Sequence, residues 1–177
     1  MTKITSMTAA AAIMIGAPAF AHDYTFETLA EGLERPWAMT FMPNGDDILM
    51  TGRNGAFSIY NAETGEVTQL DGAPEVATSG QGGLLDVALA PDFETSNVIY
   101  MTWSGAVEGG TTTHLGRGTL DLESGSVNDI ETLFQVSPGV DSDAHYGSRI
   151  VFHDNHIYWA PATGTTKTLA PTISRRT

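Results

Sequence analysis

Hydrophobic and polar positions alternate along most of the chain in short runs that polar turns interrupt. An apolar run over 37–43 is followed by the polar turn 44–47 and a second apolar run over 48–53. The same order of apolar run, polar turn and apolar run recurs over 84–104 and over 148–160. Short runs of this kind, bounded by Gly, Asn and Asp, are typical of β-strands joined by turns. The pattern therefore predicts short strands in hairpin order.

Further segments follow the same pattern. The segment 55–70 reads GAFSIYNAETGEVTQL, in which Thr64-Gly65 has the chemistry of a hairpin turn. The segment 114–134 repeats the theme around a Ser-Gly turn. Beyond the first 21 residues no stretch shows a convincing helical period. The predicted fold class is all-β.

The strand–turn–strand units also resemble one another. Phe41, Leu89 and Phe152 occupy equivalent places in three of them. A repeat of about 50 to 60 residues is the order expected for the blades of a β-propeller. Propellers close by radial repetition of four-stranded blades, and this chain has material for about two to three. We therefore predict a partial propeller over 22–159 that does not close a ring alone.

The first 21 residues have a different character. Lys3 precedes an apolar stretch from Met7 to Ala17, and Ala19-Phe20-Ala21 forms a small-residue cleavage site. This order is typical of a secretory signal peptide, and the apolar stretch is too short for a stable membrane anchor. A buried N-terminal helix is the alternative. We predict a signal peptide over 1–21 and a periplasmic or secreted mature protein.

Composition narrows the possible partners. The chain of 177 residues has 8 basic and 21 acidic side chains, a net charge of −13. Nucleic acids and anionic membranes need a basic face, so neither is an expected partner. The absence of cysteine excludes disulfides, thiolate metal sites and cysteine nucleophiles. Composition predicts no oligomeric state.

Three sequence motifs, called words below, follow one another along the chain: LERPWAMTFMPNGDDILMTGRNG, GQGGLLDVALAPDF and HYGSRIVF. Together, over about residues 30 to 158, they resemble the glucose/sorbosone dehydrogenase family of soluble, periplasmic aldose sugar dehydrogenases. The resemblance implies a six-bladed β-propeller that carries pyrroloquinoline quinone, with calcium beside it, on its axis. It also implies oxidation of the C1 hydroxyl of an aldose sugar, a small-molecule substrate, to a lactone.

Two residues fall on functional positions of those words. The resemblance implies that His145 is the catalytic base and that Gln81 binds at the cofactor and substrate pocket. The chemistry is consistent, because hydride leaves a carbinol carbon only as its O–H proton is removed, and imidazole suits that task near neutral pH. Asp143 could orient or acidify the site. The plainer interpretations are a polar loop residue for His145 and a hydrogen-bonding loop residue for Gln81.

The remaining polar candidates are interpreted as structural, and no metal-binding residue is predicted. They are Asp86 at a blade edge, Arg149 at a loop or strand start, the turn residue Arg53, the pair His153 and His156, and His114. The two paired histidines suggest a metal site, but a surface turn between two strands explains them better.

The pattern breaks near residue 160. The tail 160–177 contains proline, glycine and threonine without strand alternation, and we predict that it is irregular. The family continues at this point with a Gly-Asp-Arg turn. An out-of-frame reading of the codons for 159–168 allows that word, which favours a frameshift near 158–160. A natural short paralogue and a gene-calling artefact are the alternatives.

The resemblance implies that this chain is truncated. In the family, basic residues that bind the cofactor's carboxylates and carbonyls that hold calcium come from later blades. Of the 8 Lys and Arg residues, Lys3 lies in the predicted signal peptide, and the other 7 form no basic cluster. Retention of quinone and calcium is not expected from these residues, and we predict an aldose dehydrogenase chain that is inactive alone. A propeller-derived binding module without redox activity and a lactone-hydrolysing propeller are the alternatives; the words GQGGLLD and HYGSR together favour the dehydrogenase.

Overall fold

The computed structural model describes residues 24–162 and 172–174, and these form antiparallel β-sheets with one short helix. The first strands are β1 (Pro36–Phe41), β2 (Ile48–Gly52), β3 (Phe57–Tyr60) and β4 (Val67–Leu70). After them come β5 (Leu84–Leu89), the helix α1 (Phe93–Ser96), β6 (Val98–Val107), β7 (Gly110–Asp121) and β8 (Ser126–Gln135). The last strands are β9 (Gly147–His153), β10 (His156–Pro161) and β11 (Thr172–Ser174).

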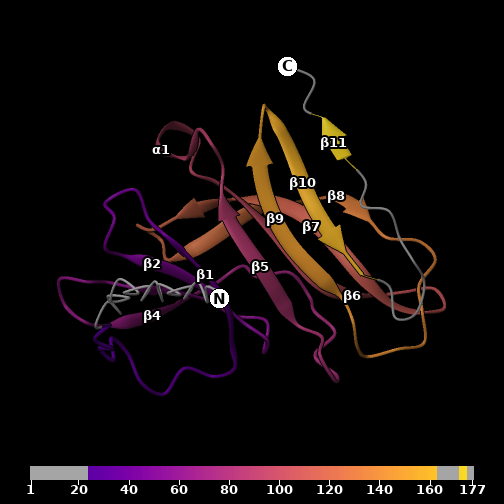
Figure 1. Cartoon of the computed structure of the whole chain (residues 1–177), viewed down its shortest axis with the longest axis horizontal. Helices are drawn as coiled ribbons and strands as arrows, with labels where there is room; N and C mark the ends of the chain where they lie inside the picture. Colours follow the sequence, from indigo (N-terminus) through magenta and orange to yellow (C-terminus); the bar gives the residue numbers. More distant parts are fainter. Residues whose placement is uncertain (1–23, 163–171, 175–177) are drawn as a thin grey trace, which may run out of the picture.

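The strands assemble into three sheets in sequence order. The first blade is β1-β2-β3-β4, the second is β5-β6-β7-β8, and the third contains β9, β10 and β11. The inner strand β5 packs beside both β1 and β9, and Figure 1 shows it between the first blade and the β9–β10 pair. Blades arranged around their inner strands are the architecture of a propeller. The predicted all-β fold of two to three blades is confirmed.

The internal repeat is visible in the strand register. In each blade the inner strand pairs with the next strand, and an aromatic or leucine residue faces an isoleucine. The three pairs are Phe41 with Ile48, Leu89 with Ile99, and Phe152 with Ile157. The residues that the sequence placed in equivalent positions therefore occupy the same place in successive blades.

The predicted hairpin turn at Thr64-Gly65 joins β3 to β4. Asn61 organises this turn, because its side-chain Oδ1 accepts the N–H of Thr64 at 2.9 Å and its carbonyl accepts the N–H of Gly65 at 2.8 Å. Gly65 has φ of 72°, a left-handed conformation that glycine adopts without steric cost. The turn chemistry read from the sequence thus produces the hairpin.

Two hydrophobic clusters fill the spaces between blades. The larger one lies between the first and second blades, and its fully buried members include Leu49, Phe57, Leu84, Ile99 and Met101. The second joins the second blade to the third through Tyr100, Leu115, Ile150, Ile157 and Trp159. Burial of such side chains stabilises the fold by about 1.5–3 kcal/mol each. The core therefore sits between neighbouring blades.

Large apolar side chains are exposed on the outer faces of the first and third blades, although Ile48, Met50 and Tyr60 of the first blade are buried against Ala30 and Leu33. On β1, Ala38 faces the second blade, while Met39 and Phe41 point away and are 66% and 59% exposed. Val151 and Tyr158 are large exposed residues on the third blade. We call these surfaces the first-blade face and the third-blade face.

The end of the described chain corrects one expectation. An irregular tail was predicted from residue 160, but β10 continues to Pro161 and pairs with β11 over Thr172–Ser174. The sequence analysis missed this because β11 is short and follows a segment without alternation. The rest of the tail and the predicted signal peptide lie outside the described residues. Within the described residues no helix has the length and apolarity needed to cross a membrane.

Candidate functional site

Two loops that lead into inner strands meet at one end of the blades. Residues 77–83 precede β5 and residues 136–146 precede β9. Gln81 lies in the first loop and His145 in the second. The side-chain Oε1 of Gln81 accepts the backbone N–H of His145 at 2.8 Å, and the N–H of Gln81 donates to the carbonyl of Asp143 at 2.6 Å. The structure therefore brings the two predicted site residues together.

The backbone of His145 is in an unusual conformation. Its φ is 62°, in the left-handed region that non-glycine residues rarely occupy. Such a conformation costs on the order of 1–3 kcal/mol and persists where surrounding contacts impose it, often at functional sites. Here the hydrogen bond that the backbone N–H of His145 donates to Oε1 of Gln81 is one such contact. As a residue His145 is exposed to solvent.

Tyr146 anchors the His145 loop to the second blade. Its carbonyl accepts the hydroxyl of Thr113 at 2.8 Å, and its own hydroxyl lies 2.8 Å from Oγ1 of Thr111 and 3.1 Å from the carbonyl of Ser142. Tyr146 is buried, whereas its neighbour His145 is exposed. Sequence reasoning missed Thr111, Thr113 and Tyr146. The three consecutive threonines at 111–113 are the only hint in the sequence. They do not indicate a hydrogen-bond partner more than 30 residues away.

The glycines of the GQGG word allow three backbones to approach closely. A side chain at Gly80 would overlap the backbone and carboxyl group of Asp143, and one at Gly83 would overlap the backbone of Arg53. Both glycines also have positive φ, of 52° and 143°. The loop around Gln81 is therefore shaped by its contacts with the first blade and with the His145 loop.

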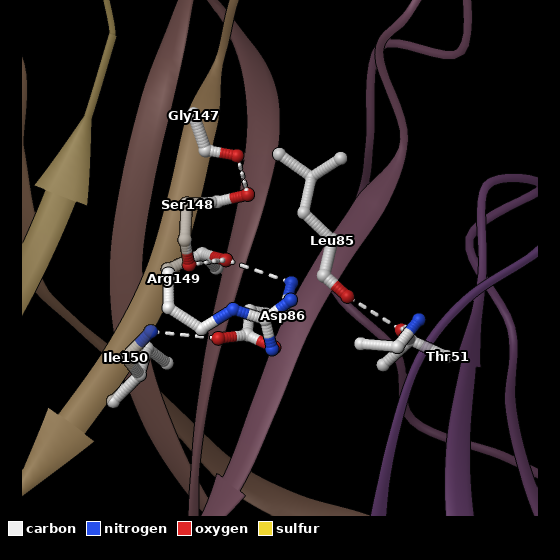
Figure 2. A network of polar contacts seen from close by, with 9 residues as sticks. Thr51, Leu85, Asp86, Gly147, Ser148, Arg149 and Ile150 are labelled. Carbon is white, nitrogen blue, oxygen red and sulfur yellow. Dashed lines mark hydrogen bonds and ion pairs between the residues drawn. The ribbon is translucent and has the colours of Figure 1, made fainter. Parts of the chain in front are cut away.

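Asp86 joins the inner strands of the second and third blades. Its carboxylate accepts the N–H of Ile150 at 2.6 Å and the Nη1–H of Arg149 at 3.0 Å (Figure 2). Its side chain is 4% exposed, whereas that of Arg149 is 70% exposed. Burial raises the pKa of Asp86, which its hydrogen bonds and the guanidinium of Arg149 oppose. Asp86 is thus structural and lies at a blade edge, as predicted.

Two threonines form the same kind of hydrogen bond across the interfaces between successive blades, which we call seams. Thr51 on β2 donates its hydroxyl to the carbonyl of Leu85 on β5 at 2.5 Å (Figure 2). Thr102 on β6 donates in the same way to the carbonyl of Ser148 on β9 at 3.2 Å. Each hydroxyl also accepts an N–H from the inner strand of its own blade. These bonds fix the spacing of the inner strands from which both loops depart.

Comparison with known proteins identifies the family. The sequence model of glucose/sorbosone dehydrogenases matches residues 33–175 of this chain. The chain belongs to the glucose/sorbosone dehydrogenase family. The resemblance seen in the sequence words is thereby confirmed.

Individual family members are similar over most of this chain. Aldose sugar dehydrogenase YliI of Escherichia coli (strain K12) is 39% identical over 127 residues, which are 71% of this chain and 34% of that protein. The soluble aldose sugar dehydrogenase of Escherichia coli in its apo form is 36% identical, with a TM-score of 0.72, over 76% of this chain and 40% of that one. The pyrroloquinoline-quinone-bound aldose sugar dehydrogenase of Streptomyces coelicolor is 30% identical, with a TM-score of 0.65, over 75% and 39%. This chain thus spans about a third of the length of the curated relatives it matches.

The histidines that the sequence analysis interpreted as structural lie among packing and turn contacts. His114 is buried and stacks on Trp103 with ring centroids 5.1 Å apart, and its burial lowers its pKa. His153 lies 3.2 Å from the carboxylate of its neighbour Asp154 in the β9–β10 turn. In the described part of the chain, no three His, Cys, Asp or Glu side chains gather so that they could hold a metal ion.

The residues of the two loops match part of the quinone site that the family implies. Gln81 uses its Oε1 on His145, which leaves the amide Nε2–H groups to donate to a ligand, and the exposed imidazole of His145 lies beside it. A tricarboxylate quinone also needs cations, because burying its charge unpaired is costly. Arg53 donates to loop carbonyls and Arg149 pairs with Asp86. These loops fit the base and amide positions, and the cations would have to come from elsewhere.

The carboxylate of Asp143 does not act on the imidazole in this arrangement. Asp143 contributes its backbone carbonyl to Gln81, and among the described residues its side chain forms no hydrogen bond or ion pair with His145. Its backbone carbonyl contacts Gln81 and not His145, so the expectation that Asp143 orients or acidifies the site stays a prediction.

Proposed function

We propose that this chain carries the part of the active site of a periplasmic quinoprotein aldose dehydrogenase that removes the substrate's proton. The supporting observation is the 2.8 Å hydrogen bond from the backbone N–H of His145 to Oε1 of Gln81, which joins an exposed histidine to a side-chain amide. The family and its aldose sugar dehydrogenases give the substrate class, a small aldose sugar. The proposed product is the lactone formed by oxidation at C1.

In this proposal, His145 and Gln81 have separate tasks. The imidazole of His145 takes the proton of the C1 hydroxyl, since removal of that proton must accompany loss of hydride from the same carbon. The Nε2–H groups of Gln81 donate to an oxygen of the bound ligands and so orient them against the imidazole. Pyrroloquinoline quinone, when bound, supplies the hydride acceptor.

We further propose that this chain alone does not oxidise sugars. The two arginines beside the loops already have partners, and the match to the curated relatives covers only about a third of their length. Cationic partners for the quinone and oxygen ligands for calcium then have to come from outside these two loops.

Dye reduction with glucose tests both statements. We expect none from the purified chain supplied with pyrroloquinoline quinone and calcium, and activity from the chain extended by the downstream frame that restores the Gly-Asp-Arg word. In the extended protein, His145→Ala should lower kcat by about 10² to 10⁴, the usual contribution of a general base. His153→Ala is the matched control, an exposed histidine at the other end of β9, and should leave kcat unchanged.

Two results would decide against the proposal. Robust dye reduction by the 177-residue chain would show a complete cofactor site within it. Equal activity of His145→Ala and the parent in the extended protein would remove His145 from the reaction. If the extended protein bound sugars without oxidising them, the alternative of a binding module would be favoured.

The proposed location follows from the N-terminal pattern alone. Ala19-Phe20-Ala21 should be cleaved on export, giving a mature chain that begins at His22. Mass spectrometry of the periplasmic fraction measures this directly, and exported protein that retains Met1 would contradict it.

A further inference from the structure

Arg53 contacts the Gln81 loop from the neighbouring blade. It follows β2 directly, and its backbone N–H donates to the carbonyl of Arg35 at 2.9 Å. Its side-chain Nε donates to the carbonyl of Gly82 at 3.2 Å, and its Nη2 donates to the carbonyl of Gly80. The guanidinium therefore binds the carbonyl groups of the two residues that flank Gln81.

The second blade holds the same loop from the other side. Ser104, on β6, accepts the N–H of Gly83 through its hydroxyl oxygen at 2.6 Å and donates that hydroxyl to the carbonyl of Ala77 at 2.7 Å. Arg53 and Ser104 thus fix the loop between two blades. Of these two residues, Arg53 is the one that binds the carbonyls adjacent to Gln81.

Gln81 connects the restrained loop to His145. Its Oε1 accepts the N–H of His145, and that residue is held at φ of 62°. A shift of the Gln81 backbone would move this acceptor and release a conformation that the backbone does not favour by itself. The contacts form a chain from Arg53 through the Gln81 loop to His145.

We propose that Arg53 is a positioning residue for His145, acting through the carbonyls of Gly80 and Gly82 and the amide of Gln81. Among the described contacts Arg53 forms no hydrogen bond or ion pair with His145 itself. The planar fork of arginine suits the task, because its donors reach two carbonyls at fixed spacing, whereas lysine presents a single point of charge. The inference rests on the proposed function only where that function makes His145 the base.

Amide hydrogen exchange of the His145 N–H measures the proposed restraint without any cofactor. Exchange reports the free energy of local opening, and the loss of one hydrogen bond corresponds to about a tenfold change. Arg53→Gln should therefore make the His145 amide exchange about tenfold faster, and Arg53→Lys should give a smaller increase. The amide of Leu49 in β2 should exchange as in the parent.

Arg117→Gln is the matched control. Arg117 is a partly exposed arginine whose guanidinium pairs with Glu131 at 2.8 Å on the second blade, distant in sequence from both loops. The Arg117→Gln substitution removes one positive charge, as Arg53→Gln does, and should leave the exchange rate of the His145 amide unchanged. A His145 exchange rate in Arg53→Gln equal to that in Arg117→Gln would overturn the proposal.

A double variant separates positioning from general loosening. Gln81→Met removes the acceptor of the His145 N–H directly, so Arg53→Gln added to it should cause no further increase in His145 exchange. Additive increases would show that Arg53 acts by another route and would overturn the proposal. If Arg53→Gln does not fold, the same comparison with Arg53→Lys decides the question. A failed dye assay of the extended protein together with this exchange pattern would reject the proposed oxidation but leave the positioning role intact.

Discussion

Removal of the Asp86 carboxylate should destabilise the seam between the second and third blades. Asp86→Ala deletes the acceptor of the Ile150 N–H, a bond of 2.6 Å within a buried region. A buried donor left without a partner costs about 1–3 kcal/mol. The bond to Arg149 adds about 0–1 kcal/mol, because that side chain is 70% exposed. The expected loss in the free energy of unfolding is therefore about 1–4 kcal/mol.

Two further variants divide this loss between its sources. Asp86→Asn keeps an oxygen that can accept the Ile150 N–H, so it should stay within about 1 kcal/mol of the parent. Arg149→Gln removes the exposed partner alone and should cost less than about 1 kcal/mol. Urea unfolding of the purified chain measures all three. An Arg149→Gln variant as unstable as Asp86→Ala would refute the reasoning, because it would place the stabilisation in the ion pair.

The pH dependence of the same variants tests the charge of Asp86. Burial raises its pKa above the ordinary 3.8, so the ionised carboxylate is less favourable in the folded chain than in the unfolded one. The parent should therefore gain stability relative to Asp86→Asn as the pH falls from neutral through the raised pKa toward 3.8. A difference that stays constant, or that moves the opposite way, would show that the carboxylate is not perturbed by its burial.

Three other predictions concern single side chains. Thr102→Val should lower the free energy of unfolding by about 1–3 kcal/mol, because it removes the bond to Ser148 and leaves the buried N–H of Asp86 unpaired. The exposed Thr68→Val on β4 should not lower it, as urea titration measures. Burial lowers the pKa of His114 below 6.5, so stability relative to His114→Phe should be complete above pH 6.5 and fall as the pH drops toward the lowered pKa. Phe41→Thr on the first-blade face should raise the solubility limit without lowering the melting temperature, because that ring is 59% exposed.

The sequence predicted the parts of the fold that depend on local pattern. Alternation and turn residues placed the blade hairpins, and the repeat correctly aligned Phe41, Leu89 and Phe152. These features depend on residues a few positions apart, so one sequence is sufficient to read them. The short strand β11 was missed because its pairing with β10 is not encoded in any alternation near it.

The seam contacts could not be predicted in the same way. Asp86 was expected to be structural, but its partner Ile150 lies 64 residues away and contributes only a backbone N–H, which any residue could supply. Thr51 and Thr102 look like ordinary strand threonines until the structure shows each hydroxyl bound to the next blade. Arg53 likewise binds carbonyls, which carry no signature in the sequence.

The location of these contacts explains how a partial propeller can hold part of a site. The described restraints on Gln81 and His145 come from neighbouring blades: Arg53 from the first, and Ser104 and Thr113 from the second. None of these contacts crosses the axis of a ring, so the geometry of the base does not require the ring to close. A ligand on the axis, by contrast, is surrounded by all blades of a propeller and needs partners from each side. The position of His145 and the capacity to bind a quinone are therefore separable properties of this fold, and the exchange and dye-reduction experiments measure them independently.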